Sequence, residues 1–202
     1  MCRSAKALFF LLMCALGMAR TANAADSPVI LNELMAANSS FVADPQGEFS
    51  DWVELHNASD AVVDAAGLYL TDDPAVPTKW RIPTDNPAQT RMAARGYLLV
   101  WLDNDVADAG LHASFGLNAG EDQVALFDQD GTTLLDSVAF KNQRTDIAYG
   151  RFPAGTDSWQ YMILATPGGQ NLVAYQGVVA DTKCSWDRGF YDQPFTVTIT
   201  TA

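Results

Sequence analysis

The sequence predicts an all-β protein with the fold of an antiparallel β-sandwich, and three observations support that prediction. Short alternating or apolar segments recur at spacings of roughly ten to twenty residues, with turn-forming residues between them. After residue 24, no stretch of about twelve residues holds the 3.6-residue apolar period of an amphipathic helix. Of the 24 acidic residues, 20 are aspartate, which favours turns and caps over helix interiors.

Each predicted strand is bounded by turn or loop residues. The segment 51–57 alternates between apolar and polar residues, and the segment 96–102 is almost entirely apolar, as expected of a central strand. Asp128-Gln129-Asp130-Gly131 stands between two strands and predicts a hairpin turn. About eight strands are predicted, over residues 29–34, 51–57, 67–72, 79–83, 96–102, 123–127, 134–140 and 147–152.

Residues 1–24 have the pattern of a signal peptide. Arg3 and Lys6 supply a positive start, an apolar run follows over residues 7–19, and Ala22-Asn23-Ala24 forms a small-x-small cleavage site. The run is shorter than the roughly 20 apolar residues of a membrane span. We therefore predict an exported protein, secreted or at the cell surface, with no transmembrane segment after the signal is removed.

Composition excludes several classes of partner and site. The formal net charge is −12, and removing residues 1–24 leaves nine cations against 24 acids, a net charge of −15. Nucleic acid and anionic membranes attract clustered Lys and Arg, so neither is expected as a partner. Cys184 is the one cysteine after residue 24, which excludes an internal disulfide and a cysteine-based zinc site.

The character of the sequence changes near residue 171. A loop-like segment over residues 166–171 ends the first block, and residues 172–183 are interpreted as a linker. The alternating run over residues 195–200 predicts a strand, and one strand alone cannot form a sheet. We therefore interpret residues 184–202 as the truncated first strand of a second β domain, and the chain as a fragment.

An ordered set of blocks lies between about Ser27 and Asn171, at residues 30–38, 51–57, 67–72, 79–80, 112–117, 131–136, 149–151 and 166–171. This set resembles the bacterial lamin tail domain. The resemblance implies an immunoglobulin-like β-sandwich that has no catalytic centre of its own and that binds or tethers in exported proteins. Through residues 187–191 and 194–195, the segment 179–202 is similar to the opening of a chitobiase/β-hexosaminidase C-terminal-like domain.

The resemblance assigns structural roles rather than catalytic ones to the motif positions. We expect a non-catalytic binding or tethering module of a larger exported protein, with no cofactor and with a protein or a cell-surface polysaccharide as partner. A carbohydrate- or calcium-binding accessory module of a secreted hydrolase is the first alternative. The positions matched to family motifs are Asn32, Glu33, Trp52, Glu54, Asn57, Gly67, Asp72, Trp80, Gly150, Arg151, Pro167, Gly168 and Asn171.

Two aspartate clusters are candidate calcium ligands, because carboxylate oxygens suit Ca²⁺. Neither cluster completes an EF-hand loop, and Asp with Gly favours solvated turns, so the turn interpretation is preferred. The candidates are Asp103, Asp105 and Asp108 in one cluster and Asp128 and Asp130 in the other.

A hydrolase is the second alternative. Glu54 and His56 share a strand face, and with Glu33 they could form an acid/base or metal site. The simpler interpretation is that Glu54 and Asn57 bind backbone groups around a loop while His56 lies on a solvated face.

Four tryptophans could form a stacking platform for sugars, although a strand tryptophan more often belongs to the core. Because Trp52 alternates with Val53 and Leu55, we expect one of these two sets to face outward. The four are Trp52, Trp80, Trp101 and Trp159.

Overall fold

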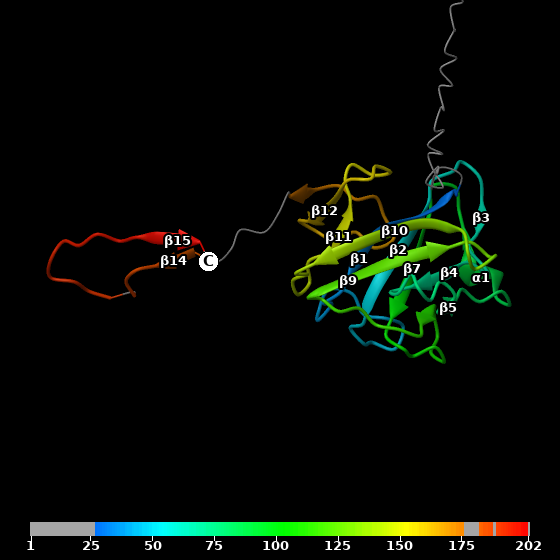
Figure 1. Ribbon diagram of the computed structural model, residues 1–202, viewed down its shortest axis with the longest axis horizontal. Helices are drawn as coiled ribbons and strands as arrows, with labels where there is room; N and C mark the ends of the chain where they lie inside the picture. Colours follow the sequence, from blue (N-terminus) through cyan, green and yellow to red (C-terminus); the bar gives the residue numbers. More distant parts are fainter. Residues whose placement is uncertain (1–26, 176–181, 188, 202) are drawn as a thin grey trace, which may run out of the picture.

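The computed structural model describes residues 27–175, 182–187 and 189–201. The predicted signal peptide lies outside these residues, as does the middle of the predicted linker. Apart from one short helix, the regular secondary structure of the described part consists of short strands, which confirms the predicted all-β fold class (Figure 1). The helix α1 (Pro87–Thr90) is a single turn. No helix in the described ranges is long and apolar enough to cross a membrane.

The larger sheet of the sandwich has seven strands, with β1 and β2 near its middle. Its neighbouring strands pair antiparallel, except that β7 and β8 run parallel. From one edge to the other the strands are β13 (Ala174–Tyr175), β12 (Trp159–Met162), β11 (Tyr149–Arg151), β1 (Val29–Met35), β2 (Asp51–Asn57), β7 (Tyr97–Leu102) and β8 (His112–Ala113).

The smaller sheet has four strands and packs against the larger one, with β10 in contact with β1 (Figure 1). Its order is β10 (Leu134–Lys141), β9 (Glu121–Phe127), β4 (Tyr69–Thr71) and β5 (Trp80–Arg81). The predicted turn at residues 128–131 joins β9 to β10. A separate two-stranded pair is formed by β3 (Val63–Asp64) and β6 (Arg91–Met92).

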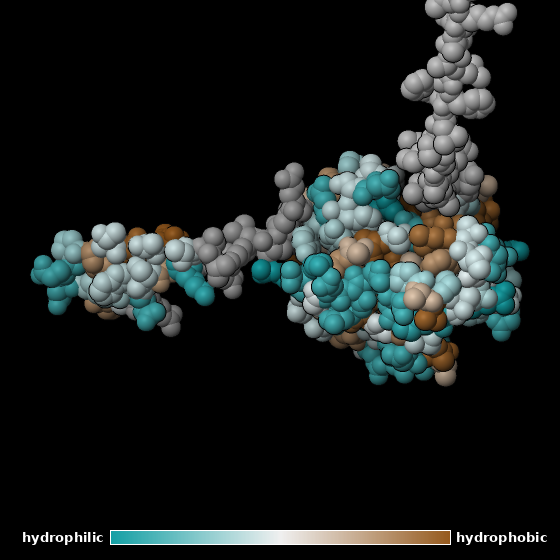
Figure 2. Space-filling view, viewed as in Figure 1, coloured by the Kyte–Doolittle hydropathy of each residue, from teal (hydrophilic) through white to brown (hydrophobic). Residues whose placement is uncertain are grey.

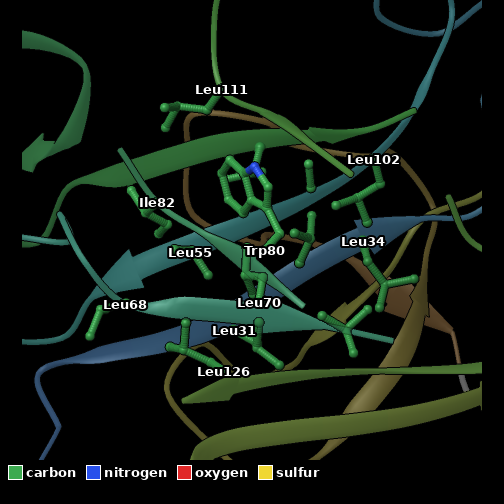
Figure 3. Close-up of a cluster of buried hydrophobic side chains, with 14 of the residues drawn as sticks. Leu31, Leu34, Leu55, Leu68, Leu70, Trp80, Ile82, Leu102, Leu111 and Leu126 are labelled. Carbon is green, nitrogen blue, oxygen red and sulfur yellow. The ribbon is translucent and has the colours of Figure 1, made fainter. Parts of the chain in front are cut away.

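The main core fills the space between the two sheets. Val53 and Leu55 of β2 face the same apolar cluster as Leu70 of β4 and Leu126 of β9, and all four side chains are fully buried. Figure 3 shows Trp80 in the middle of this cluster. Burying one valine or leucine side chain contributes roughly 1.5–3 kcal/mol to stability. The inward-facing apolar side chains of the two sheets therefore hold the sheets together.

The other face of the larger sheet is also covered. Trp52 is fully buried there, in a second cluster with Met35 of β1, Trp101 of β7 and Met162 of β12. Phe41 and Val42, from the loop between β1 and β2, pack over this cluster. The expectation that either Trp52 or its neighbours Val53 and Leu55 would face outward is therefore wrong, because loops close the second face.

This burial also corrects the idea of a tryptophan platform for sugars. Trp52, Trp80 and Trp101 are buried in the two clusters, so they cannot line an exposed row. Trp159 is half-buried against the main core, with the guanidinium of Arg151 5.1 Å from the centre of its ring.

The C-terminal residues form a hairpin of their own. The strand β14 (Thr182–Cys184) pairs antiparallel with β15 (Ile199–Thr201). Trp186 and Tyr191 pack on Phe195, with ring centres 4.7 and 4.4 Å away. The structure thus differs from the expected single strand, because the alternating run pairs with residues of the predicted linker.

Candidate functional site

Two glutamates face each other near the centre of the larger sheet. A β-bulge between Leu31 and Glu33 shifts the register of β1, so that Glu33 pairs with Glu54 of β2. Both residues are 0% exposed. On the other side of β1, Glu33 pairs with Gly150, where a Cβ would lie 2.6 Å from Asn171 Nδ2. Position 150 therefore requires glycine, because any side chain there would clash with Asn171.

We call this cluster of Asn32, Glu33, Glu54, Thr166, Gly168 and Asn171 the acid clasp. Thr166 N donates to Glu33 Oε2 at 3.0 Å, and Gly168 N donates to Glu54 Oε2. Asn32 Nδ2 donates to Glu54 Oε1 at 2.8 Å. Every carboxylate oxygen of the glutamate pair has a donor within hydrogen-bond distance. The clasp therefore holds the loop over residues 165–171 on the sheet.

Burial changes the protonation of the glutamate pair. Loss of water raises the pKa of Glu33 to about 8, with a further contribution from repulsion by Glu54, although hydrogen bonds from Thr166 oppose the rise. Burial likewise raises the pKa of Glu54 to about 7 against the hydrogen bonds from Gly168 and Asn32. Such values suit proton transfer near neutral pH, but both carboxyl groups are enclosed, and each of their oxygens already has a donor within the protein.

His56 does not join the glutamates. Its Nδ1 lies 3.2 Å from the carbonyl oxygen of Gly96, and its ring stacks on Tyr97 with centres 4.5 Å apart. Burial lowers the pKa of His56, and the charge of Arg95 lowers it further. His56, Tyr97 and Arg95 line a pocket of about 320 Å³. The expectation that His56 lies on a solvated face is therefore wrong, because Tyr97 covers the ring.

Asn57 closes the turn that follows β2. It is fully buried, and its Nδ2 donates to the carbonyl oxygens of Ala61 at 2.7 Å and Ala93 at 2.8 Å. Its Oδ1 accepts from Ser59 N at 3.0 Å. The side chain therefore satisfies three backbone groups at once.

Arg151 joins three strands through a buried ion pair. Its Nη2 donates to both carboxylate oxygens of Asp136 on β10, at 2.8 and 2.7 Å, and its Nε donates to Leu31 O on β1 at 2.7 Å. Asp136 Oδ2 also accepts from Leu31 N at 2.8 Å. The sequence singled out Arg151 but gave Asp136 no separate role.

The remaining motif positions are also structural. Gly67 has φ +85° in the turn before β4, and Trp80 lies in the main core. Asp72 pairs with Lys79 Nζ at 2.5 Å. Pro167 precedes Gly168, whose φ is +83°, in the loop that the acid clasp holds.

The β9–β10 turn uses its aspartates for local hydrogen bonds. Asp130 accepts from the backbone and hydroxyl of Thr133 and from Thr132 N, and these bonds lower its pKa to about 2. Asp128 Oδ1 accepts from Gln129 N at 2.7 Å. These bonds are typical of a solvated turn.

Of the five calcium candidates, one lies in a mixed cluster of potential metal ligands. Asp103, after β7, comes together with His112 of β8 and with Asp44, which lies in the loop between β1 and β2. One potential ligand atom from each side chain lies within 4.8 Å of the others. Asp105 and Asp108 are exposed and lie outside this group.

A family model described as the Lamin Tail Domain matches residues 22–142, more than half of the chain. The chain belongs to the lamin tail domain family. No curated protein and no solved structure matches the chain.

The lamin tail domain match and the sandwich end at different places. The match ends at residue 142, whereas β11, β12 and β13 and the loop of the acid clasp follow it in the chain and complete the larger sheet. The lamin tail domain of this chain therefore includes motif residues beyond the matched range, namely Gly150, Arg151 and Asn171.

Sequence reasoning missed Asp44 and gave His112 no role. Asp44 stands in a loop with ordinary turn residues, so no local pattern distinguishes it. The available signal was one of the chain's two histidines, His112, shortly after two aspartates, Asp103 and Asp108.

Proposed function

We propose that this lamin tail domain is a non-catalytic binding or tethering module of a larger exported protein, secreted or at the cell surface. Membership in the family supports a binding role. The enclosure of Glu33 and Glu54 supports the absence of a catalytic role for that pair, because a reacting group must be reached by substrate. The signal-like residues 1–24 support export, and the acidic composition supports a partner other than nucleic acid.

The observation that carries the binding role is an apolar edge on the larger sheet. Ile163 N donates to Val173 O at 3.1 Å, so the segments on either side of the β12–β13 turn lie side by side. Four large apolar side chains there are more than half exposed: Ile163, Leu164, Leu172 and Val173. By contrast, hydrophilic side chains cover much of the face seen in Figure 2.

An edge of this kind suits a partner that adds to the sheet. Among the described residues, the strand β13 ends the seven-stranded sheet and pairs with one neighbour, β12. An edge strand leaves backbone groups free to pair with another chain, and neighbouring apolar side chains add contact area. We propose this edge, defined by residues 163–164 and 172–175, as the binding face, and an extended segment of a cell-surface protein as its partner, with a cell-surface polysaccharide as the alternative.

The test is a co-sedimentation assay with envelope preparations from the organism that encodes the chain. We expect the wild-type protein to pellet with the envelope, and the double variant Leu164→Lys/Leu172→Lys to stay in the supernatant. Val62→Lys is the matched control, because Val62 and Leu172 are both 67% exposed and Val62 lies away from this edge.

Two further measurements separate the parts of the proposal. Pretreating the envelope with protease or with glycosidase distinguishes a protein partner from a polysaccharide. Mass spectrometry of the exported protein checks for an N-terminus at Ala25. Equal pelleting of the double variant and the wild type would contradict the assigned face, and an intact residue 1 in the mature protein would contradict the predicted signal.

A further inference from the structure

We propose that Asp44, Asp103 and His112 bind a divalent transition-metal ion, for which Zn²⁺ is the probe. The three side chains come from separate elements: the β1–β2 loop, the end of β7 and β8. The proposal rests on the buried oxygen of Asp44, on the contacts of the His112 ring and on the mixture of ligand types.

Asp44 has a buried carboxylate oxygen that lacks a partner. Its Oδ1 accepts from Gln46 N at 2.9 Å and from Glu48 N at 2.8 Å. Its Oδ2 is buried without a hydrogen bond, in a residue that is 7% exposed. Buried polar atoms are nearly always paired, and a buried carboxylate needs a cation or donors. Because Oδ1 is occupied, Oδ2 is the oxygen that remains for a metal ion.

The His112 ring faces oxygen acceptors at both nitrogens. Nδ1 lies 2.8 Å from Asp103 Oδ2, and Nε2 lies 3.2 Å from Ala109 O. The side chain is 0% exposed. A neutral imidazole carries one N–H, so it can donate to only one of these two oxygens, and the other oxygen faces a lone pair. When a cation binds Nδ1 and Asp103 Oδ2, the single N–H at Nε2 is free to donate to Ala109 O.

The spacing of these atoms is close to that of two ligands of one ion. Zinc binds imidazole nitrogen and carboxylate oxygen at about 2.0–2.2 Å in tetrahedral geometry, which places neighbouring ligands about 3.4 Å apart. The 2.8 Å between Nδ1 of His112 and Oδ2 of Asp103 therefore widens by about half an ångström when the ion binds between them. The side chain of Asp103 is 10% exposed, so a water molecule can complete the coordination from the solvent side.

The ligand set selects a transition metal over calcium. Imidazole suits zinc and its neighbours, whereas Ca²⁺ takes six to eight oxygen ligands. Two carboxylates with one neutral imidazole balance the charge of a divalent ion. Asp105 and Asp108, which would supply further oxygens, are exposed and outside the group. The proposed site therefore uses Asp103 alone among the three calcium candidates at residues 103–108.

A bound ion would fasten the β1–β2 loop to the β7–β8 edge of the sheet. The same loop contributes Phe41 and Val42 to the cover over the second core cluster. A disulfide cannot serve this purpose, since Cys184 is the one cysteine after residue 24. Because the three ligands meet only in the folded chain, metal binding stabilises the folded state.

The test uses the full chain after treatment with a chelator. We expect calorimetric titration to show one Zn²⁺ bound per chain. At a hundredfold excess of free Zn²⁺ over Kd, the melting temperature should rise by about 5–10 °C. Calcium at the same free concentration as Zn²⁺ should leave the melting temperature unchanged. No Zn²⁺ binding, or a larger shift with Ca²⁺ than with Zn²⁺, overturns the proposal.

Asp44→Asn is the decisive variant, because the Asn Oδ1 can still accept from Gln46 and Glu48 while the anionic Oδ2 is lost. We expect it to fold and to lose both Zn²⁺ binding and the thermal shift. Asp128→Asn removes the same charge from the exposed β9–β10 turn and should bind Zn²⁺ like the wild type. If Asp44→Asn does not fold, Asp103→Asn takes its place with the same expectation. Unchanged Zn²⁺ affinity in the folded variant contradicts the site.

Discussion

Glu33 and Glu54 face each other across β1 and β2 with no exposed surface, and the loss of water raises their pKa values to about 8 and about 7. In the unfolded chain both groups titrate near pH 4.5. Between these values the folded protein holds protons that the unfolded chain releases, so the free energy of unfolding falls as the pH rises.

The first prediction concerns this pH dependence. From pH 5 to pH 8 the wild-type protein should lose unfolding free energy on the order of 6 kcal/mol, measured by urea denaturation. Glu33→Gln should flatten the curve between pH 7 and 8, because the remaining Glu54 titrates near 7. Asp130→Asn is the control, since hydrogen bonds lower the Asp130 pKa to about 2 and its effect is confined to acid pH. Wild-type stability that rises over this range would contradict the prediction.

The second prediction concerns the buried pair of Arg151 and Asp136. Arg151→Met leaves a buried carboxylate without its cation and should cost about 3–5 kcal/mol of unfolding free energy. Adding Asp136→Asn removes that charge while an oxygen remains for Leu31 N, so the double variant should cost less than the sum of the single ones. Arg95→Met is the control, because its pair with Asp60 is exposed and should contribute less than about 1 kcal/mol. Additive costs would mean that the pair is not coupled.

At the scale of elements, the loop over residues 165–171 is held in place by hydrogen bonds to β1, a strand far from it in sequence. Asn171 donates to Arg151 O at 2.9 Å and to Asn32 O at 3.2 Å, and it accepts from Thr166 Oγ1 at 3.0 Å. The bulge in β1 lies between Leu31 and Glu33, so it places Asn32 at the junction of the strand and the loop. The loop is thus an extension of the sheet rather than a free connection.

The third prediction follows from these bonds. Asn171→Ala should speed amide hydrogen exchange at Thr166 and Gly168 by about tenfold to a hundredfold, because their acceptors sit in the acid clasp. Exchange at Leu55, in the main core, should stay unchanged. Gln170→Ala, at an exposed neighbouring position, is the matched control. Equal protection in the two variants would show that Asn171 does not hold the loop.

At the scale of the whole molecule, the larger sheet is buried on both faces. One face meets the smaller sheet, and the other lies under the β1–β2 loop and residues near 165. Trp52 and Leu55, three positions apart in β2, are both fully buried and belong to different clusters. A sandwich with one solvated face would leave Trp52 in water.

The fourth prediction tests this arrangement. Trp52→Ala should cost about 3–5 kcal/mol of unfolding free energy, and Leu55→Ala about 2–5 kcal/mol, measured by denaturation. Val62→Ala, at a side chain that is 67% exposed, should change it by less than about 0.5 kcal/mol. A cost for Trp52→Ala as small as that for Val62→Ala would mean that the second face is solvated.

The sequence located the longer strands because alternation and turn residues are local signals. The eight predicted segments correspond to β1, β2, β4, β5, β7, β9, β10 and β11. The strands β3, β6, β8, β12, β13 and β14 were missed because they have only two to four residues, too few to show a period. Such strands are defined by pairing with a neighbour rather than by their own residues.

For the candidate site, the sequence predicts which residues share a face of one strand, but it does not predict contacts between strands. It placed Glu54 and His56 on one face of β2, but it could not show that Tyr97 from β7 covers His56. It grouped Asp103 with Asp105 and Asp108 because they are close in the chain. In the structure Asp103 lies with Asp44 and His112 instead, since the order β2–β7–β8 brings the β1–β2 loop beside that edge.

By itself, the sequence determined the all-β class, the positions of the longer strands, the acidic surface and the likeness to the lamin tail domain. These properties depend on residues within a few positions of one another, or on composition. The tertiary structure alone decided that both faces of the larger sheet are covered, that Glu33 and Glu54 are enclosed, and that Asp44 meets His112. Such contacts join segments far apart in the chain, and the order and register of the strands set them.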